Sequence, residues 1–194
     1  MWDQQPDGSW QMRVDKNGNK VLQKSQPPEI LFIERCVQCL MSGTGRMAMV
    51  IPNGILNNPA LGYVRQWMLR HTQILSVVDM ARDLFQPKND TQTSMVLMRR
   101  LSANEERVAA TKGLSYPIFM AVAEKIGHDK RGNTIYRRTA DGKDVIVARK
   151  ELVTEIDEAS GEEILKEIEV RDRVVADELP EVAEAYPKWL KAHQ

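Results

Sequence analysis

Pro52, Asn53 and Gly54 are the residues whose types and position could do chemistry. They follow residues 47–51, a short and continuously apolar run of the kind that forms a strand covered on both faces of a parallel sheet. Ligands of α/β sheets bind beyond the carboxyl ends of the strands, so this tripeptide could border the active site. The alternative is a tight turn, for which Asn-Gly is well suited. The residues alone favour the turn.

A second set of candidates is basic. Residues 125–150 contain more Lys and Arg than Asp and Glu, whereas the chain from residue 151 onward is rich in acidic residues. Cations that line a groove contact DNA phosphates, although charged hairpins are more often simply solvated. The candidate DNA contacts in this region are Lys130, Arg131, Arg137 and Arg138.

Metal and nucleophilic chemistry have little support. Cys36 and Cys39 have the spacing of a redox pair or half a zinc site, but they lie inside an apolar helical pattern and no second Cys/His pair follows. Buried free cysteines are common core residues, which is the interpretation we favour. The histidines His71, His128 and His193 fit no catalytic or metal-binding pattern. The sequence therefore predicts no metal site.

The elements that would position these residues alternate as in an α/β fold. Pro27 and Pro28 open a predicted helix that Gly43 and Gly45 end, and a second helix is expected over residues 59–71. Buried strands are expected over residues 47–51, 74–78 and 94–98. Because residues 84–92 carry no helical pattern, the last two strands are predicted to form an antiparallel pair at the edge of the sheet.

The segments before and after the predicted sheet have different sequence patterns. The turn-rich residues 1–28 form a polar insertion in which Asn17-Gly18 could close a hairpin, a ribbon that is marginal without a packing partner. Residues 29–101 carry the sheet. Residues 102–194 form a C-terminal extension with a predicted helix over 116–126, a β-meander from 134–138 and 145–149, and an amphipathic helix over 179–192. Residues 162–170 fit helix or strand.

The composition indicates in which compartment the protein works and which partners it can have. Lys plus Arg and Asp plus Glu both number 27, so the net charge gives no support of its own for DNA binding. No apolar run approaches the roughly 20 residues that span a bilayer, and the N-terminus lacks the pattern of a signal peptide. With two cysteines in the chain, these features predict a cytoplasmic protein without membrane association.

Several segments in succession resemble the modification subunit of type I restriction systems, the adenine-N6 DNA methylases. They are PPEILFIERCVQCL, GRMAMVIPNGILNNPALGYVRQWML, ILSVVD and LFQPKNDTQTSMVLM, followed by YPIFMAVAEKIGHDKRGN and VVADELPEVAEAYPKWLK, which resemble the C-terminal extension of that family. The resemblance covers about residues 27–148 and 174–192. It implies the C-terminal half of a class I S-adenosylmethionine-dependent methyltransferase, a Rossmann-like sheet with an antiparallel edge strand, plus a small α+β appendage.

The same resemblance shows what the chain lacks. In that family S-adenosylmethionine lies over a Gly-rich turn after a strand, and an Asn/Asp-Pro-Pro-Phe/Tyr loop holds the adenine. Gln26-Pro27-Pro28-Glu29 has neither the Asn/Asp nor the aromatic residue, and it precedes a helix. Gly43-Thr44-Gly45 lies between a helix and a strand, the wrong order for the cofactor. The cofactor implied is S-adenosylmethionine, but this chain has no complete site for it.

One element of the base-binding site is expected to be present. Related adenine methylases offer an aromatic side chain between the last two strands that stacks on the flipped base, and Phe85 matches that place. The alternative is that Phe85 only packs the edge of the sheet. The loop after it, which includes the DNA-contact candidate Lys88, is bulkier and more polar than in the relatives.

Three hypotheses follow. In the first, the chain is part of an adenine-N6 DNA methyltransferase that works only with a polypeptide carrying the donor-binding and Asn-Pro-Pro-Phe motifs. The implied partners are DNA, the N-terminal half of the methyltransferase, a specificity subunit and a restriction subunit. The alternatives are a non-catalytic module that docks DNA or a specificity subunit, and an inactive truncated remnant. An unpaired half-sheet exposes an apolar edge. The first hypothesis therefore predicts that the chain by itself is poorly soluble and that the partner polypeptide makes it soluble.

Overall fold

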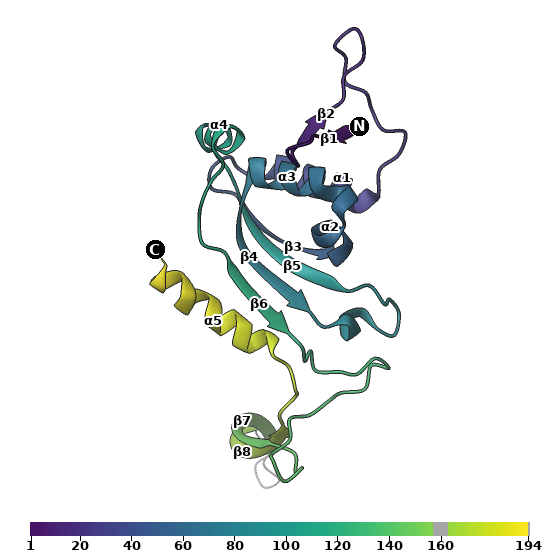
Figure 1. Ribbon diagram of the computed structural model, residues 1–194. Coiled ribbons are helices and arrows are strands. Elements are labelled where there is room, and N and C mark those ends of the chain that lie inside the picture. The colour runs from purple at the N-terminus through teal and green to yellow at the C-terminus, as the bar shows by residue number, and fades with distance from the viewer. Residues whose placement is uncertain (157–162, 194) are drawn as a thin grey trace.

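The centre of the protein is a mixed α/β unit built on a four-stranded sheet (Figure 1). The computed structural model describes residues 1–156 and 163–193. Its sheet has the order β3-β5-β4-β6, and the strands are β3 (Arg46–Pro52), β4 (Thr72–Met80), β5 (Thr93–Arg100) and β6 (Phe119–Ala123). Strand β5 is antiparallel to both of its neighbours, whereas β4 and β6 are parallel.

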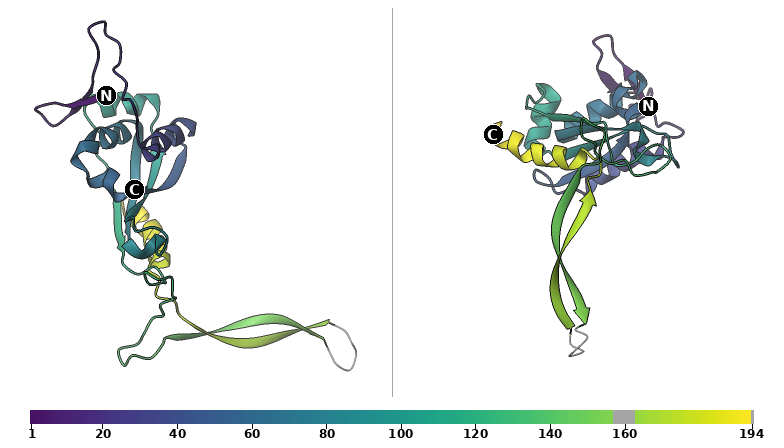
Figure 2. Two further views of the ribbon diagram at one scale, coloured as in Figure 1. Left: turned by 90° about the vertical axis from the view of Figure 1, so that its right-hand side faces the viewer. Right: turned by 90° about the horizontal axis from the view of Figure 1, so that it is seen from below.

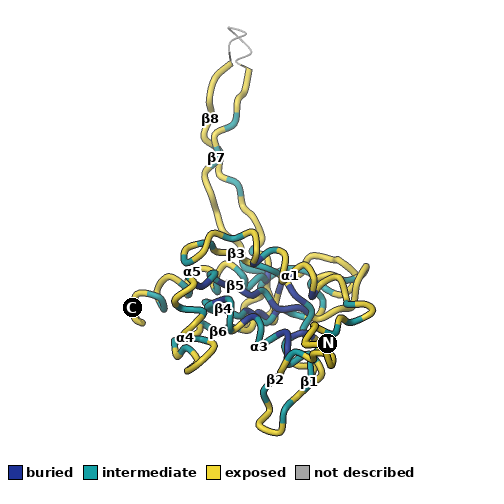
Figure 3. The backbone as a smooth tube through the Cα atoms, turned by 90° about the horizontal axis from the view of Figure 1, so that it is seen from above, coloured by how far each residue is buried: buried dark blue, intermediate teal, exposed yellow. Residues whose placement is uncertain are grey.

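Helices lie on both faces of this sheet. Helices α1 (Pro28–Cys39) and α3 (Gly62–His71) cover one face and build the main core, which includes Ile33, Ile51 and Met98. Helix α5 (Leu179–Ala192) lies on the other face along β6, where Leu179 and Val182 pack near Ala123. The buried residues accordingly gather where β3, β4 and β5 meet α1 and α3 (Figure 3).

Helix α1 forms where its sequence pattern predicts it. Proline in the first turn removes no hydrogen bond, because the first amides of a helix have no partner within it. Ile30, Ile33 and Val37 recur on one side and are buried. Gly43, with φ of +80°, follows the end of the helix as predicted. Short helix α2 (Asn53–Asn57) and the 3-10 turn η1 (Pro59–Leu61) then link β3 to α3.

The predicted N-terminal hairpin is confirmed, and it has a packing partner. Asn17-Gly18 forms the turn, with Val14 bridged to Lys20. A first ribbon, β1 (Trp2–Gln4) and β2 (Trp10–Met12), precedes it. Trp10 lies against Gly62 of α3, and Gln66 receives a hydrogen bond from the Trp10 amide (2.7 Å) and donates one to its carbonyl (3.0 Å). Helix α3 therefore supplies the support that an isolated ribbon lacks.

The helix predicted over residues 116–126 is wrong, because residues 119–123 are strand β6. Their apolar side chains fit the period of a helix as well as that of a strand. The strand forms because Ser76 to Met80 of β4 pair in parallel with Phe119 to Ala123. The prediction that β4 and β5 form the edge of the sheet is wrong as well, because β6 pairs with the outer side of β4. Antiparallel β5 lies inside the sheet between β3 and β4, and the edges are β3 and β6.

The strand at residues 47–51 is predicted to be covered on both faces, and this is also wrong. Burial along β3 alternates: Ile51 is buried, whereas Ala48 and Val50 are exposed, Val50 by 46%. Helices α1 and α3 cover the face to which Met47, Met49 and Ile51 point. The opposite face of β3 has no cover among the described residues.

Beyond the sheet, a long ribbon projects from the body (Figure 2). It pairs β7 (Ile146–Ile156) with β8 (Glu163–Arg173), in antiparallel register from Ile146–Arg173 to Ile156–Glu163. The predicted β-meander is wrong, since residues 134–138 make only isolated bridges and residues 146–149 belong to the ribbon. The undecided residues 163–170 are strand, and residue 162 lies outside the described residues.

Helix α4 (Ala103–Thr111) begins with a capping box. Ser102 Oγ accepts the amide hydrogen of Glu105, and a Glu105 carboxylate oxygen accepts the Ser102 amide (2.7 Å). Arg99 of β5 also donates to this carboxylate (2.7 Å). Hydrogen bonds from Arg99 and then Ser102 lower the pKa of Glu105 from 4.5 to about 2. The start of α4 is thus tied to the sheet through one carboxylate.

Glu105→Gln tests this tie. The pKa of the folded carboxyl lies below its unfolded value, so its contribution to stability is present above about pH 4.5 and is lost as the pH falls toward 2. We expect the variant to be destabilised at neutral pH by about 0.5–2 kcal/mol, as for other cap substitutions. The difference should disappear in acid, measured by urea unfolding across that range. A similar loss from Glu184→Gln, on the exposed side of α5, would contradict a specific role for Glu105.

Candidate functional site

Three polar side chains meet at the carboxyl ends of β3 and β4, beside the start of β5. Asn53 Nδ2 donates to Asp79 Oδ1 (2.8 Å), and the Ser94 hydroxyl lies 2.6 Å from Asn53 Oδ1 and 3.2 Å from Asp79 Oδ1. Strands β3 and β4 run in the same direction, because each is antiparallel to β5. Their carboxyl ends therefore lie at the same edge of the sheet, where α/β proteins place ligands.

Asn53 belongs to this edge, but the Asn-Gly turn favoured by the sequence is wrong. Asn53 and Gly54 open helix α2 directly after Pro52, and neither residue has a positive φ. The Asn53 amide donates to the Gln92 carbonyl (3.0 Å), and Gln92 Nε2 reaches Asp79 Oδ2 (3.3 Å). The sequence interpretation missed Asp79 and Ser94. A usable signal existed, since Asp79 is the first charged residue after an apolar run.

Phe85 is presented to solvent by an anchored loop. It ends the 3-10 turn η2 (Arg82–Phe85), which follows β4 after a single residue. Leu84 packs inward against the cluster of Val78, Met80 and Ala123, while Phe85 is 43% exposed. Arg82 holds Asp90 through two hydrogen bonds of 2.9 and 2.7 Å, which lowers the pKa of that carboxyl. The loop thus places an aromatic ring at the carboxyl edge of the sheet.

Basic candidates flank this loop. Lys88 is exposed in the loop itself. Lys130 and Arg131 form the tip of a hairpin that Asp129 and Asn133 close, and a Cβ at the neighbouring Gly132 would lie 3.7 Å from Pro87. The fold therefore brings Phe85, Lys88 and the hairpin tip to one surface, although they are separated by more than forty positions in the sequence.

Arg137 and Arg138 lie elsewhere, at the base of the ribbon. Arg137 forms an ion pair with Glu181 of α5 and donates to the Asp177 carbonyl (3.0 Å). Arg138 lies 3.7 Å from Asp144. Both line an open hollow of about 910 Å³ that also contains Glu178. Carboxylates of the same chain offset these arginines, so the hollow is not a basic groove.

The described residues contain no group of three His, Cys, Asp or Glu side chains placed to hold a metal ion. Cys36 is half-buried and Cys39 is exposed, both as free thiols, so the interpretation of the two as buried core residues is wrong. His71 pairs with Glu106 at 3.1 Å. Within the part of the chain that the structure describes, no helix is long and apolar enough to cross a membrane.

The described residues do not fit S-adenosylmethionine as a complete site. In the family that the sequence resembles, this cofactor lies over a Gly-rich turn that leads from a strand into a helix. Strand β3 leads directly into α2, β4 leads through Ala81 into η2, and β5 leads through Leu101 and Ser102 into α4. None of these three connections contains a Gly-x-Gly sequence.

No protein-family model and no curated protein matches the chain. Among solved structures, it is similar to a protein from a study of complex assembly and conformational transition of the type I R-M system, with 23% identity and a TM-score of 0.37 over 46% of this chain and 19% of that one. It is also similar to a modification subunit assigned to a type I restriction enzyme from Vibrio vulnificus YJ016, with 16% identity and a TM-score of 0.35 over 56% of this chain and 21% of that one. The chain spans about a fifth of the length of these proteins.

Proposed function

We propose that this chain forms the C-terminal half of the methyltransferase sheet of an adenine-N6 DNA methylase of the type I modification-subunit kind. The complete enzyme would transfer a methyl group from S-adenosylmethionine to adenine in DNA. A partner segment would supply the donor site and the Asn-Pro-Pro-Phe loop. This chain would hold the flipped adenine and contact the DNA backbone.

The observation that carries this proposal is the surface around Phe85. Phe85, which is 43% exposed, is held at the carboxyl edge of β4 by the half-buried Leu84 and the Arg82–Asp90 pair. Lys88 is exposed in the same loop, and the hairpin with Lys130 and Arg131 approaches this loop where Gly132 lies close to Pro87. An aromatic ring to stack on an unpaired base, with cations placed for phosphates, is the combination that single-stranded or flipped nucleotides require.

The requirement for a partner is supported by strand β3. It pairs with β5 on one side only, and no strand among the described residues pairs with its other side. Ala48 and Val50 are exposed on its uncovered face. An open edge with exposed apolar side chains pairs readily with another strand. A partner segment could pair a strand with this edge and pack a helix on the uncovered face.

Methyl transfer from labelled S-adenosylmethionine to adenine-containing DNA tests the proposal. The assay compares the chain alone with the chain plus the polypeptide encoded immediately upstream. We expect activity only in the mixture, and a gain in solubility of the chain. No activity in either case, with the chain soluble and monomeric by itself, would contradict the proposal and favour an interaction module or an inactive remnant.

Phe85→Ala in the active mixture tests the base-stacking role. Loss of stacking, worth about 1–3 kcal/mol per base, should lower kcat/KM between roughly fivefold and a hundredfold. Phe85→Trp should retain most of the activity because it keeps a stacking surface. The thermal midpoints of both variants should match that of the parent, since the ring is exposed. Equal losses in both variants, or a parallel loss of stability, would assign Phe85 to packing instead.

A further inference from the structure

Strand β6 has one covered face and one uncovered face. Phe119 packs edge-on against Tyr186 and Trp189 of α5, with ring centroids 5.5 and 5.6 Å apart. Ala121 and Ala123 belong to the same cluster as Leu179 and Val182. Because side chains alternate along a strand, Met120 and Val122 point to the other face. There they are 72% and 64% exposed.

The helix layer on that other face stops before it reaches β6. Val96, Val77 and Met120 are paired across β5, β4 and β6 and share one face of the sheet. Val96 is 1% exposed and Val77 packs against the core under α1 and α3, whereas Met120 is open. The high exposure of Met120 and Val122 therefore marks where the helix layer ends, at the strand next to β4.

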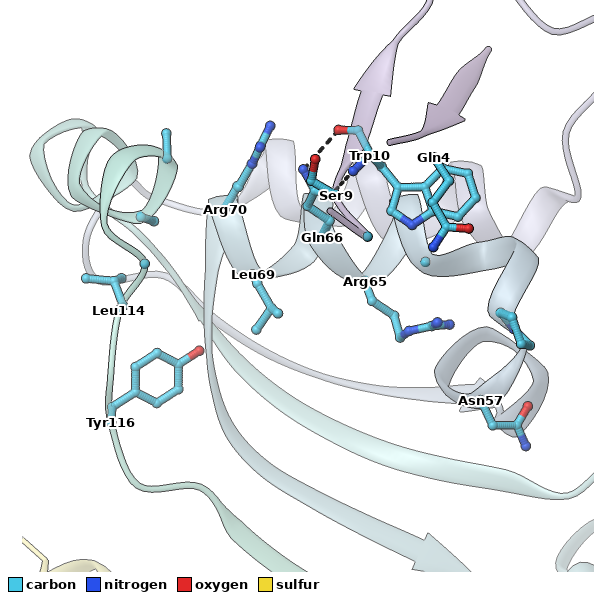
Figure 4. Close-up of a pocket in the computed structure, with 16 residues that line it drawn as sticks. Gln4, Ser9, Trp10, Asn57, Arg65, Gln66, Leu69, Arg70, Leu114 and Tyr116 are labelled. Atoms are coloured by element: carbon cyan, nitrogen blue, oxygen red, sulfur yellow. Dashed lines mark hydrogen bonds between the residues drawn. The ribbon is translucent and has the colours of Figure 1, made fainter. Parts of the chain in front are cut away.

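Residues just before β6 line a pocket beside α3 (Figure 4). Leu69 of α3 is 50% exposed and lines an open pocket of about 730 Å³ with Leu114 and Tyr116. The Tyr116 hydroxyl accepts the amide hydrogen of Ile74 (3.2 Å), which fixes the ring toward α3. We name the surface formed by Leu69, Leu114, Tyr116, Met120 and Val122 the β6 strip.

The pocket at one end of the β6 strip has a one-sided charge. Its 16 lining residues include Arg65 and Arg70 and no Asp or Glu. Arg65 is held by the carbonyls of Ile55 and Asn58 at 2.9 and 2.8 Å. Among the described residues, the Arg70 guanidinium has no hydrogen-bond or ion-pair partner. A ligand carboxylate would complement Arg70.

We propose that the β6 strip docks an amphipathic α-helix of a partner polypeptide. The apolar side of that helix packs on Leu69, Met120 and Val122, and an Asp or Glu near one end of the helix pairs with Arg70. The apolar content of the strip favours a helix over DNA, since phosphates need cations along the whole contact. Helix α5 of a second copy is less suited, because Val182, Tyr186 and Trp189 already cover its own β6. The strip lies at the β6 edge, opposite the open edge of β3, so this site is independent of the proposed methylase partner.

Fluorescence anisotropy with a panel of synthetic peptides tests the proposal. The peptides are about 18 residues long, or five helical turns, with a common Leu/Ile face and either Glu or Lys on the flank. We expect Glu-flanked members to bind with Kd below about 100 µM and Lys-flanked members at least tenfold more weakly. The double variant Met120→Thr/Val122→Thr should abolish binding without changing the thermal midpoint, and Arg70→Glu should reverse the charge preference.

Val50→Thr, an exposed change on β3, is the matched control and should leave binding unchanged. Binding by no peptide of the panel would overturn the proposal, as would binding that persists in the double variant. Displacement of the peptide by a DNA duplex would assign the strip to nucleic acid. Self-association of the parent chain that disappears in the double variant would assign it to a second copy. Either of these results would also overturn the helix-docking proposal.

Discussion

Replacing Gly45 by alanine is expected to destabilise the protein by about 3 kcal/mol or more, because the new methyl group would meet backbone that cannot move aside. Gly45 lies in the turn that carries the chain from α1 into β3. A Cβ there would be 2.6 Å from the Met41 nitrogen, 2.8 Å from the Met41 oxygen and 2.8 Å from Leu40 Cβ. The Gly45 amide also donates to the Met41 carbonyl (2.8 Å), and its carbonyl accepts from the Arg100 amide (2.8 Å).

Gly54→Ala is the matched control for Gly45→Ala. No atom lies within 4 Å of a Cβ at Gly54, and its φ is not positive. Alanine is the better helix former, so this change in α2 should be neutral or stabilising by about 0.4–1 kcal/mol. Urea unfolding of the two variants measures the difference directly. If Gly45→Ala unfolded at the same urea concentration as the parent, the tight approach of residues 40–45 would be contradicted.

The sequence predicts the parts of this fold whose signals are local. Pro28 at a helix start, Asn17-Gly18 in a turn, and the apolar runs of β3, β4 and β5 all depend on a few neighbouring residues, and the structure confirms them. Helix α5 is confirmed at its predicted bounds. In each case the local preference and the tertiary environment agree.

Strand β6 escaped prediction because its signal is not local. Ile118, Phe119, Val122 and Ile126 match a helical period, yet the hydrogen bonds of β4 and the rings of Tyr186 and Trp189 are available only to a strand. Those partners lie about forty or more positions away along the chain. The place of β5 inside the sheet depends on the same long-range pairing, so missing β6 also put the predicted sheet edge in the wrong place.

The candidate site divides in a similar way. A sequence pattern can place Asn53 at the end of a strand, and the resemblance points to Phe85. Neither indicates that Asn53, Asp79 and Ser94 hydrogen-bond to one another, or that Gly132 in the hairpin lies close to Pro87. These arrangements depend on strand order and on the path of a hairpin. Arg137, which the basic composition of residues 125–150 suggested as a phosphate contact, forms an ion pair with Glu181 that the sequence does not indicate.

Met98→Ala is expected to cost about 2–5 kcal/mol, since its side chain is 0% exposed in the middle of β5 and its loss would leave a cavity. Met98 pairs with Met47 on one side and Ile74 on the other, under α1 and α3. Met120→Ala removes the same atoms from the same face of the sheet, at a position 72% exposed. It should change the free energy of unfolding by less than about 0.5 kcal/mol.

The contrast between the two methionines, measured by urea unfolding, tests where the helix layer ends. A layer that stops over β4 predicts a large cost at Met98 and almost none at Met120. If Met120→Ala proved as costly as Met98→Ala in the isolated chain, Met120 would already be covered there, and the β6 strip would not be open to a partner. With the helical peptide bound, the same variant should instead lose stability relative to the parent, because a ligand stabilises only the folded state that binds it.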